Sequence, residues 1–402
     1  MKHTRILSTV GLALIAQATQ VFADHPLTIT AAGTYANDAW SSENPNVAAV
    51  TIASSVPAGA TITITSASIT SRGPMIQCNA TGINLVVYDV SAHGQNPLVA
   101  GKAKGDFVNM YLPGSVHVFW CYIESVAHAL VVSGNKSTTS TASIQFNNNV
   151  VRNIDGRLSN GSNGYQNTPW ASVGAACVSI VNVRSDPNIS ITYNDVRNFQ
   201  GQSLSGDLFD LYSTSGTQTG HIVLANNFVK GQFPNNDSET GGRGVFVMDG
   251  DITNSALPTQ YVDIHDNQCI ACEASGIYLY WGENFNVYNN RVVTSMIDAS
   301  TGAAYQSNGT GIGLQDASGS LNWGTTWQVY NNVVGAMGPG ASSREDFTFN
   351  PSSLQNQATG NTSLTSSPTA AITLDEEANE EKKWVEARQY PNGFQLIGPT
   401  SY

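Results

Sequence analysis

The residues of this 402-residue chain that are best suited to chemistry are charged side chains in apolar or glycine-rich segments between positions 207 and 251. Asp210 lies in an apolar segment, where an unpaired carboxyl group has a raised pKa and could serve as an acid, a base or a metal ligand. Glu239 and Arg243 follow in a glycine-rich insertion, and Asp249 and Asp251 follow the next apolar segment. These five charged groups predict one shared site.

Aromatic side chains occur in the same part of the chain: Tyr212, Phe246, Tyr278, Tyr280 and Trp281. Aromatic rings stack on the apolar faces of sugar rings, and a row repeated on strands about 4.8 Å apart suits an extended glycan. Alternatively, the rings stack only on one another and stabilise a sheet. We expect them to contact a polysaccharide substrate, with Lys230 as a further contact.

A repeated asparagine pattern indicates which elements position these side chains. One six-residue pattern recurs six times. It consists of an apolar residue, two positions that usually include Asp or Asn, a fixed Asn, one further position and a second apolar residue. The fixed positions are Asn149, Asn194, Asn227, Asn267, Asn290 and Asn332. Self-similarity at a fixed period indicates a repeat architecture. A sharp bend between two strands needs positive φ, which Asn tolerates, and stacked amides can hydrogen-bond from one turn to the next.

The pattern resembles the asparagine ladder of right-handed parallel β-helices of the pectate-lyase type. The resemblance implies an all-β fold: a single-stranded right-handed parallel β-helix (solenoid) of roughly ten turns. Each turn would have three strands, with the ladder Asn between the second and the third. The Asp-Pro-His-Asp signature of alginate epimerases is missing, as is the polygalacturonase set of Asn-Thr-Asp, Asp-Asp, Gly-His-Gly and Arg-Ile-Lys. The resemblance therefore concerns the fold, and no catalytic residue is carried over from a family.

The first strands of the turns would carry the site. Aligning the inward pairs Phe209 and Leu211, Val245 and Val247, and Ile277 and Leu279 sends the intervening residues outward. One outward row then contains Asp210, Phe246 and Tyr278, and the next contains Tyr212, Met248 and Tyr280. A one-residue error in this register would exchange the two faces. Long insertions on both sides of these strands predict a walled groove.

Two reactions of enzymes with this fold fit the predicted groove. A lyase that cleaves an acidic glycan by β-elimination needs a base and a group that neutralises the uronate. Three residues could be the base: Arg243, Lys230 and Tyr278. Three carboxylates could hold Ca²⁺ through hard oxygen ligands: Asp210, Asp249 and Asp251.

A glycoside hydrolase would instead need two carboxylates that flank the scissile bond. Asp210 could pair with Asp249 or with Asp207. A third hypothesis is a carbohydrate-binding or adhesive β-helix without catalysis, which would scatter its carboxylates. We expect the lyase first, with the hydrolase and the non-catalytic protein as alternatives.

The remaining segments predict export and capping. Residues 1–23 combine a basic start, a short apolar run and small residues, which is typical of a signal peptide and predicts a secreted or periplasmic protein. The run is too short to span a membrane. Residues 24–60 would cap the N-terminal end of a β-helix over 61–340. Residues 341–402 would form a C-terminal segment whose short charged helix, 375–388, packs back on the solenoid, caps it or belongs to a tail.

Composition limits the partners. A net charge of −12 argues against nucleic acid, and it is also unfavourable for a polyanionic substrate unless basic residues or a cation gather locally. We expect a monomer. The five cysteines include Cys269 and Cys272, for which a disulfide is an alternative to buried thiols.

Overall fold

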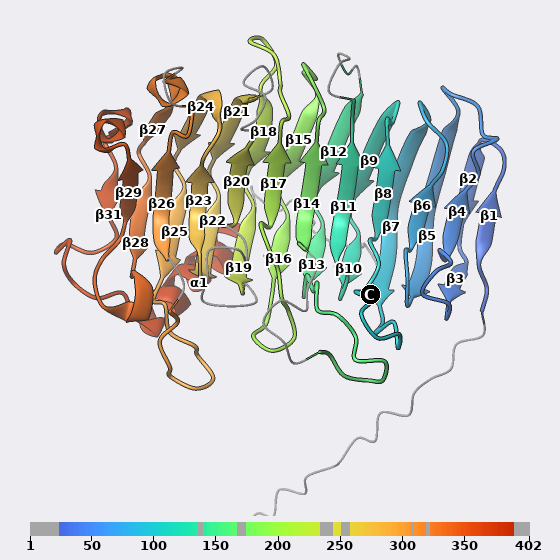
Figure 1. Ribbon diagram of the computed structural model, residues 1–402, viewed down its shortest axis with the longest axis horizontal. Coiled ribbons are helices and arrows are strands. Elements are labelled where there is room, and N and C mark those ends of the chain that lie inside the picture. Colours follow the sequence, from blue (N-terminus) through green and yellow to red (C-terminus); the bar gives the residue numbers. More distant parts are fainter. Residues whose placement is uncertain are drawn as a thin grey trace, which may run out of the picture.

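The computed structural model describes residues 24–135, 140, 142–166, 174–233, 244–250, 258–306, 309–318 and 322–389. The strands form two long sheets in which neighbouring strands run parallel. In Figure 1 they follow one another across the molecule from β1 to β31. This all-β arrangement is consistent with the predicted solenoid.

The first sheet, called here the eleven-strand sheet, contains the strands predicted to carry Asp210 and Tyr278. Its strands are, in spatial order, β1 (Leu27–Ile29), β4 (Val50–Ile52), β6 (Ile76–Cys78), β8 (Val108–Tyr111), β11 (His128–Ser133), β14 (Ala176–Val181), β17 (Phe209–Tyr212), β20 (Phe246–Asp249), β23 (Ser275–Leu279), β26 (Thr310–Gln315) and β29 (Phe347–Asn350).

The second sheet has twenty strands. It consists of two arms, which we call the second arm and the third arm because they contain the second and third strands of each turn. The arms are joined because β5 (Thr61–Ser71) and β7 (Asn84–Gly94) run through both. The second arm adds β2 (Gly33–Ala36), β9 (Ser115–Phe119), β12 (Ser143–Asn147), β15 (Ile189–Thr192), β18 (Ile222–Ala225), β21 (Thr259–His265), β24 (Gly282–Tyr288), β27 (Gln328–Tyr330) and β30 (Ala358–Thr359). The third arm adds β3 (Ala39–Ser42), β10 (Tyr122–Glu124), β13 (Val150–Arg152), β16 (Asp195–Arg197), β19 (Phe228–Gln232), β22 (Gln268–Cys272), β25 (Arg291–Thr294), β28 (Val333–Ala336) and β31 (Thr362–Ser363).

The asparagine ladder lies between the second and third arms, as predicted. Each amide nitrogen donates to the amide oxygen of the next turn; the Nδ2–Oδ1 distance is 3.0 Å from Asn227 to Asn267 and again from Asn267 to Asn290. The six predicted asparagines are almost fully buried. Asn361 accepts from Asn332 at 2.9 Å and extends the ladder by one turn that the sequence pattern missed.

The bend itself differs from the prediction. Positive φ occurs one residue before each ladder position, for example at Tyr193, Asp266 and Asn289. The ladder residues point inward to reach the neighbouring amide, so the preceding residue makes the turn. This explains why the position before the ladder Asn is rich in Asn and Asp, which tolerate the left-handed conformation.

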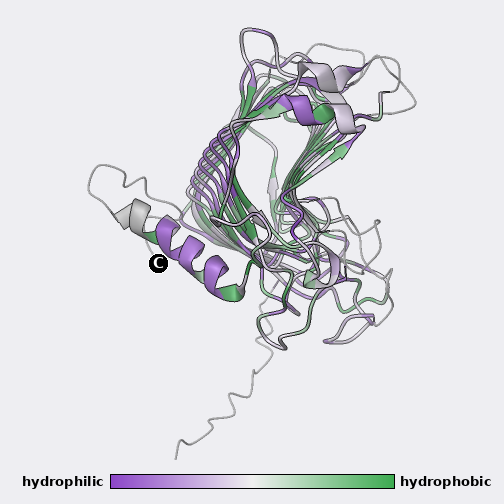
Figure 2. Cartoon of the chain, turned by 90° about the vertical axis from the view of Figure 1, so that its left-hand side faces the viewer, coloured by the Kyte–Doolittle hydropathy of each residue, from purple (hydrophilic) through white to green (hydrophobic). Residues whose placement is uncertain are grey.

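Apolar side chains from the eleven-strand sheet and both arms fill one interior. Figure 2, a view along the stack, shows the strands superimposed around this interior, with α1 (Leu374–Gln389) outside. Phe209 and Phe246 stack in the core with ring centroids 4.9 Å apart. All five cysteines are buried and free, so Cys269 and Cys272 form no disulfide.

Parallel pairing extends beyond the predicted bounds of 61–340 at both ends. At the N-terminal end β1 pairs with β4, within the segment expected to be a cap, and at the C-terminal end β28 pairs with β31. The sequence signal is weak there because the terminal strands are short and rich in Thr and Ser. Three 3₁₀ helices lie among the described residues of the C-terminal part: η2 (Trp323–Thr326), η3 (Pro339–Ala341) and η4 (Ser352–Gln357).

The charged helix predicted in the tail packs back on the solenoid. α1 contacts β22 and β25 of the third arm, and the Trp384 ring stacks on Phe228 with centroids 5.3 Å apart. Among the described residues, no helix has both the length and the apolar composition needed to cross a membrane.

Candidate functional site

Asp210 lies on the outward face of β17, where the sequence places it. Its neighbours Phe209 and Leu211 are fully buried, whereas Asp210 is partly exposed. The parallel register puts Asp210 beside Ser179 on one neighbouring strand and Val247 on the other. The Ser179 hydroxyl donates to Asp210 Oδ2 at 3.2 Å. Asp207, the alternative partner, accepts from the Gly244 N–H at 3.2 Å at the start of the strand.

The predicted register is wrong by one residue in β20. Phe246 aligns with Phe209 and points into the core, where it is fully buried; it is therefore no substrate contact. Met248 also points inward, and Val247 and Asp249 take the outward positions. The segment Val245–Met248 is apolar at every position, so alternation gave no signal, and the stacking of two phenyl rings decides the register.

This corrected register brings Asp249 into the site more directly than predicted. Asp249 lies beside Tyr212 in the ladder between β17 and β20. Asp210 and Asp249 are therefore diagonal neighbours, one strand apart and two residues apart along the strand. With strands about 4.8 Å apart and a rise of about 3.3 Å per residue, their Cα atoms are roughly 8 Å apart. Asp249 Oδ1 accepts the Gly250 N–H at 2.7 Å.

Two tyrosines continue this face toward the C-terminal end. Tyr278 lies beside Val247 and Gly313 in the register, and its ring stacks on Tyr280 with centroids 6.2 Å apart. The Tyr278 hydroxyl donates to Gln315 Oε1. A Cβ added at Gly313 would lie 2.5 Å from Tyr278 Cδ2, so the ring lies over the glycine. The face thus combines two carboxylates with three tyrosines.

Two predicted substrate contacts are not exposed on this face. Trp281 is only 5% exposed and packs edge-on against Trp323. Lys230 belongs to β19 of the third arm, and its Nζ donates to Glu381 of α1 at 2.6 Å. Lys230 lies on the third arm because it follows the asparagine bend. Trp281 lies against Gly250, directly after β20, but little of its ring is exposed to a substrate.

Three predicted residues, Glu239, Arg243 and Asp251, lie outside the described residues. The expected Ca²⁺ site depended on Asp251 beside Asp210 and Asp249. Within the part of the chain that the structure describes, no group of three or more His, Cys, Asp or Glu side chains is arranged to hold a metal ion.

The charge of the face is one-sided. The eleven strands of this sheet contain no Lys or Arg, and their two carboxylates are Asp210 and Asp249. The histidine of β11, His128, is held between Asp106 Oδ1 at 2.7 Å and the Gly174 carbonyl at 2.8 Å. A uronate chain would therefore meet acidic side chains on these strands without a neutralising cation from them.

Long connections flank the two ends of these strands, as predicted. The connections that follow β17, β20 and β26 and those that precede β17, β20 and β26 are longer than the turns around β23. One described cavity lies at the C-terminal ends of β8, β11 and β14; it has a volume of about 170 Å³ and is lined by Asn135, Asn182 and Arg184 among others. A second, larger cavity of about 430 Å³ lies against α1.

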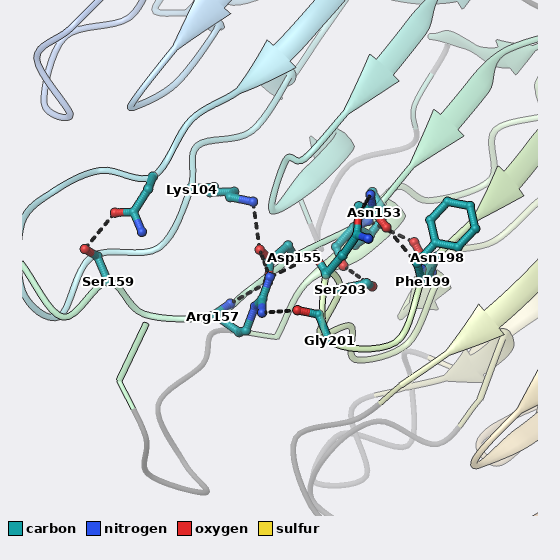
Figure 3. A network of polar contacts seen from close by, with 12 residues as sticks. Lys104, Asn153, Asp155, Arg157, Ser159, Asn198, Phe199, Gly201 and Ser203 are labelled. Atoms are coloured by element: carbon teal, nitrogen blue, oxygen red, sulfur yellow. Dashed lines mark hydrogen bonds and ion pairs between the residues drawn. The ribbon is translucent and has the colours of Figure 1, made fainter. Parts of the chain in front are cut away.

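A buried ion-pair network, which sequence reasoning missed, holds together the connections that precede β14 and β17. Asp155 is fully buried and pairs with Lys104 Nζ at 2.7 Å and Arg157 Nε at 2.7 Å. Arg157 also donates to the carbonyls of Gly201 and Gln202, which ties one connection to the next (Figure 3). Burial alone would raise the pKa of Asp155, but the two cations lower it overall. Glycine-rich sequence around Asp155 signalled only a loop.

No protein-family model, curated protein or solved structure matches this chain.

Proposed function

We propose that the protein is a secreted, carbohydrate-active enzyme with a right-handed, pectate-lyase-like β-helix of roughly ten turns. In this proposal a glycan lies along the outward face of the eleven-strand sheet. Asp210 and Asp249 hydrolyse its glycosidic bond. The alternating strands position both carboxylates on one face, and the flanking connections shield it.

The diagonal relation of Asp210 and Asp249 is the observation that supports hydrolysis most strongly. Inverting glycosidases place their two carboxyl groups about 6.5–9.5 Å apart, so that a water molecule fits beside the sugar. The register sets the two Cα atoms roughly 8 Å apart. Because both side chains leave the same face of the sheet, we infer a comparable distance between their carboxyl groups. One carboxyl group would protonate the leaving oxygen while the other deprotonates the attacking water.

Both carboxylates accept hydrogen bonds from the scaffold that positions them. The Gly250 N–H donates to Asp249, and the Ser179 hydroxyl donates to Asp210. We therefore assign Asp210 and Asp249 together as the acid–base pair of the proposed reaction.

The tyrosines would bind the sugar rings on either side of the scissile bond. Tyr212 and Asp249 are direct neighbours, and Tyr278 and Tyr280 follow on β23 and at its end. Aromatic rings supply apolar area, and their hydroxyl groups supply hydrogen bonds. The absence of Lys and Arg from the described strands of this sheet favours a neutral glycan over a uronate chain.

β-Elimination remains the second proposal because Tyr278 presents a phenol on the same face. A tyrosine can act as the base next to a uronate carboxylate. Ca²⁺ held by Asp210, Asp249 and Asp251 would then supply the neutralising charge. This chemistry needs a cation that the described strands do not provide.

A polysaccharide panel distinguishes the proposals. The secreted chain is incubated with neutral and acidic glycans, with and without Ca²⁺, and both reducing ends and the ultraviolet absorbance of unsaturated uronates are followed. Hydrolysis of a neutral glycan gives reducing ends alone. Unsaturated products would identify a lyase, and silence across the panel would favour the non-catalytic protein.

A further inference from the structure

A second cavity lies on the other side of the molecule, between α1, β19 and the connection that follows β25. Its volume is about 430 Å³. Its lining is mainly apolar and includes three aromatic rings, two carboxylates and one lysine: Phe199, Phe233, Tyr305, Asp298, Glu377 and Lys230. A cavity of this size holds a small molecule with one or two rings.

The aromatic rings form one wall that is fixed in place. Phe233 and Tyr305 contact each other with centroids 6.4 Å apart, and the Tyr305 hydroxyl donates to Gln200. Phe199 is 46% exposed, and its backbone N–H donates to Asn153 Oδ1 at 3.0 Å within the network of Figure 3. An exposed phenyl ring on an anchored backbone offers an aromatic face at little entropic cost.

The carboxylates around these rings create a negative potential. Glu377 is 8% exposed, and burial raises the pKa of its carboxyl group, although the Ser295 N–H donates to it. Hydrogen bonds from Ser300 lower the pKa of Asp298, which is therefore ionised at neutral pH. Burial raises the pKa of Tyr305, and the charges of Glu273, Asp298 and Glu377 raise it further. The carboxylates of Glu273, Asp298 and Glu377 are thus all close enough to Tyr305 to raise the pKa of its hydroxyl group.

The single lysine does not cancel this potential. Lys230 Nζ is 2.6 Å from Glu381 Oε2, and the other oxygen of Glu381 accepts from Arg197. Arg197 in turn pairs with Asp195 at 2.8 Å. Glu381 and Asp195 pair with these cations, and the ionised Asp298 and the buried Glu377 are further acidic groups of the lining.

We propose that this cavity binds a small organic cation, an amine or quaternary ammonium group on an apolar body. Aromatic faces attract such cations within about 6 Å of the ring centroid, most strongly where water is excluded. The apolar body would fill the space lined by Met296, Ile297 and Leu374, and the ammonium group would lie between the aromatic wall and Glu377. This inference does not depend on the proposed glycan cleavage.

Three probes of matched size test the proposal by isothermal titration calorimetry on the full secreted chain at neutral pH. They are phenethylamine, 2-phenylethanol and phenylacetate, which share a phenyl ring and carry a cationic, a neutral and an anionic polar group. We expect the amine to bind at least about tenfold more tightly than the alcohol, a difference of about 1.4 kcal/mol, and phenylacetate to bind most weakly. Equal binding of the amine and the alcohol, or no binding of the amine, overturns the proposal.

Two variants locate the site. Glu377→Gln should weaken the amine about tenfold and leave the alcohol unchanged, whereas Glu283→Gln, a carboxylate of β24 outside the cavity lining, should change neither. If Glu377→Gln loosens α1, Phe199→Ala gives the answer, because a half-exposed ring is removed without a core cavity. Unchanged amine binding in Phe199→Ala excludes this cavity as the site.

Discussion

Two outward faces of the stack differ in how their charged side chains are paired. On the third arm, basic residues of successive strands meet carboxylates of α1: Arg197 and Lys230 bind Glu381, and Arg291 binds Glu380. On the eleven-strand sheet, the strands hold Asp210 and Asp249 and no Lys or Arg. The first face is covered by a helix of opposite charge, and the second presents acids and tyrosines.

The two faces differ in what covers them within the described residues. Glu380 is 1% exposed and also accepts from Gln268, so its charge is fully used in holding the helix. The outward row of Asp210, Val247 and Tyr278 has no covering helix among the described residues. A solenoid repeats its scaffold, so functional differences between faces come from the residues that the repeat does not constrain.

The largest expected effect is on catalysis at the acidic face. Asp210→Asn and Asp249→Asn should each lower kcat by a factor of about 10² or more, because general acid–base groups contribute about 10²–10⁴. The melting temperature should change little, since both side chains lie outside the core. Activity is measured on the glycan that the panel identifies.

Glu283→Gln is the matched control, since it neutralises a carboxylate of β24 away from this face. Loss of stability with normal turnover in Asp210→Asn would make Asp210 a structural partner of Ser179. That result would contradict the proposed difference between the catalytic face and the helix-covered face.

The ladder beneath both faces gives the next largest effect. Asn267→Ala removes the amide that accepts from Asn227 at 3.0 Å and donates to Asn290 at 3.0 Å and to the Leu224 carbonyl at 2.9 Å. Because buried polar partners are left unsatisfied, we expect a loss of about 3 kcal/mol or more in the free energy of unfolding. Urea denaturation measures it; a loss below about 0.5 kcal/mol would contradict a buried ladder.

The helix-covered face should respond to acid. Burial alone would raise the pKa of Glu380 and of Glu381, but hydrogen bonds and charges from Arg291, Lys230 and Arg197 lower both overall. Carboxyl groups with lowered pKa values stabilise the folded state above their unfolded pKa of about 4.3 and lose this stabilisation as pH falls through the folded values. Glu377 has the opposite sign, since its pKa is raised.

Because the pKa values of Glu380 and Glu381 are lowered and that of Glu377 is raised, we expect α1 to detach from the third arm below about pH 4. The fluorescence of Trp384, which stacks on Phe228, reports the release. Glu380→Gln should lower the free energy of unfolding of the docked helix by about 1–3 kcal/mol at neutral pH. We expect the lower part of this range because Arg291, its partner, is partly exposed and water weakens the ion pair. A helix signal independent of pH and of this variant would refute the electrostatic attachment.

The smallest expected effect belongs to Tyr278. Tyr278→Phe keeps the ring over Gly313 and its stacking with Tyr280 but loses the hydrogen bond to Gln315. For a substrate-binding role we expect less than a tenfold change in kcat/KM, equivalent to less than about 1.4 kcal/mol. A loss of more than 10² with an unchanged KM would instead make Tyr278 the base of a lyase.

Sequence reasoning succeeded where one side chain determined its own environment. The ladder asparagines were predictable because the amide must be buried and paired in each turn, and Asp210 was predictable because Phe209 and Leu211 flank it with clear alternation. Phe246 was misplaced because its segment is apolar throughout. Lys230 was misplaced although it follows the ladder residue Asn227, which puts it on the third strand of its turn. Trp281 was misplaced because its packing depends on Trp323, which is distant in sequence. The cavity beside Tyr305 depends on the docking of α1, which no local pattern records.

The first product of the glycan reaction tests the roles of Asp210 and Asp249 most directly. Time-resolved ¹H nuclear magnetic resonance of the fresh product identifies the anomer before it equilibrates. A carboxylate pair on diagonal positions, with room for water, predicts a hydrolysis product of inverted configuration. A product of retained configuration, or one with a double bond in the sugar ring, would contradict the assignment of Asp210 and Asp249 as an inverting pair.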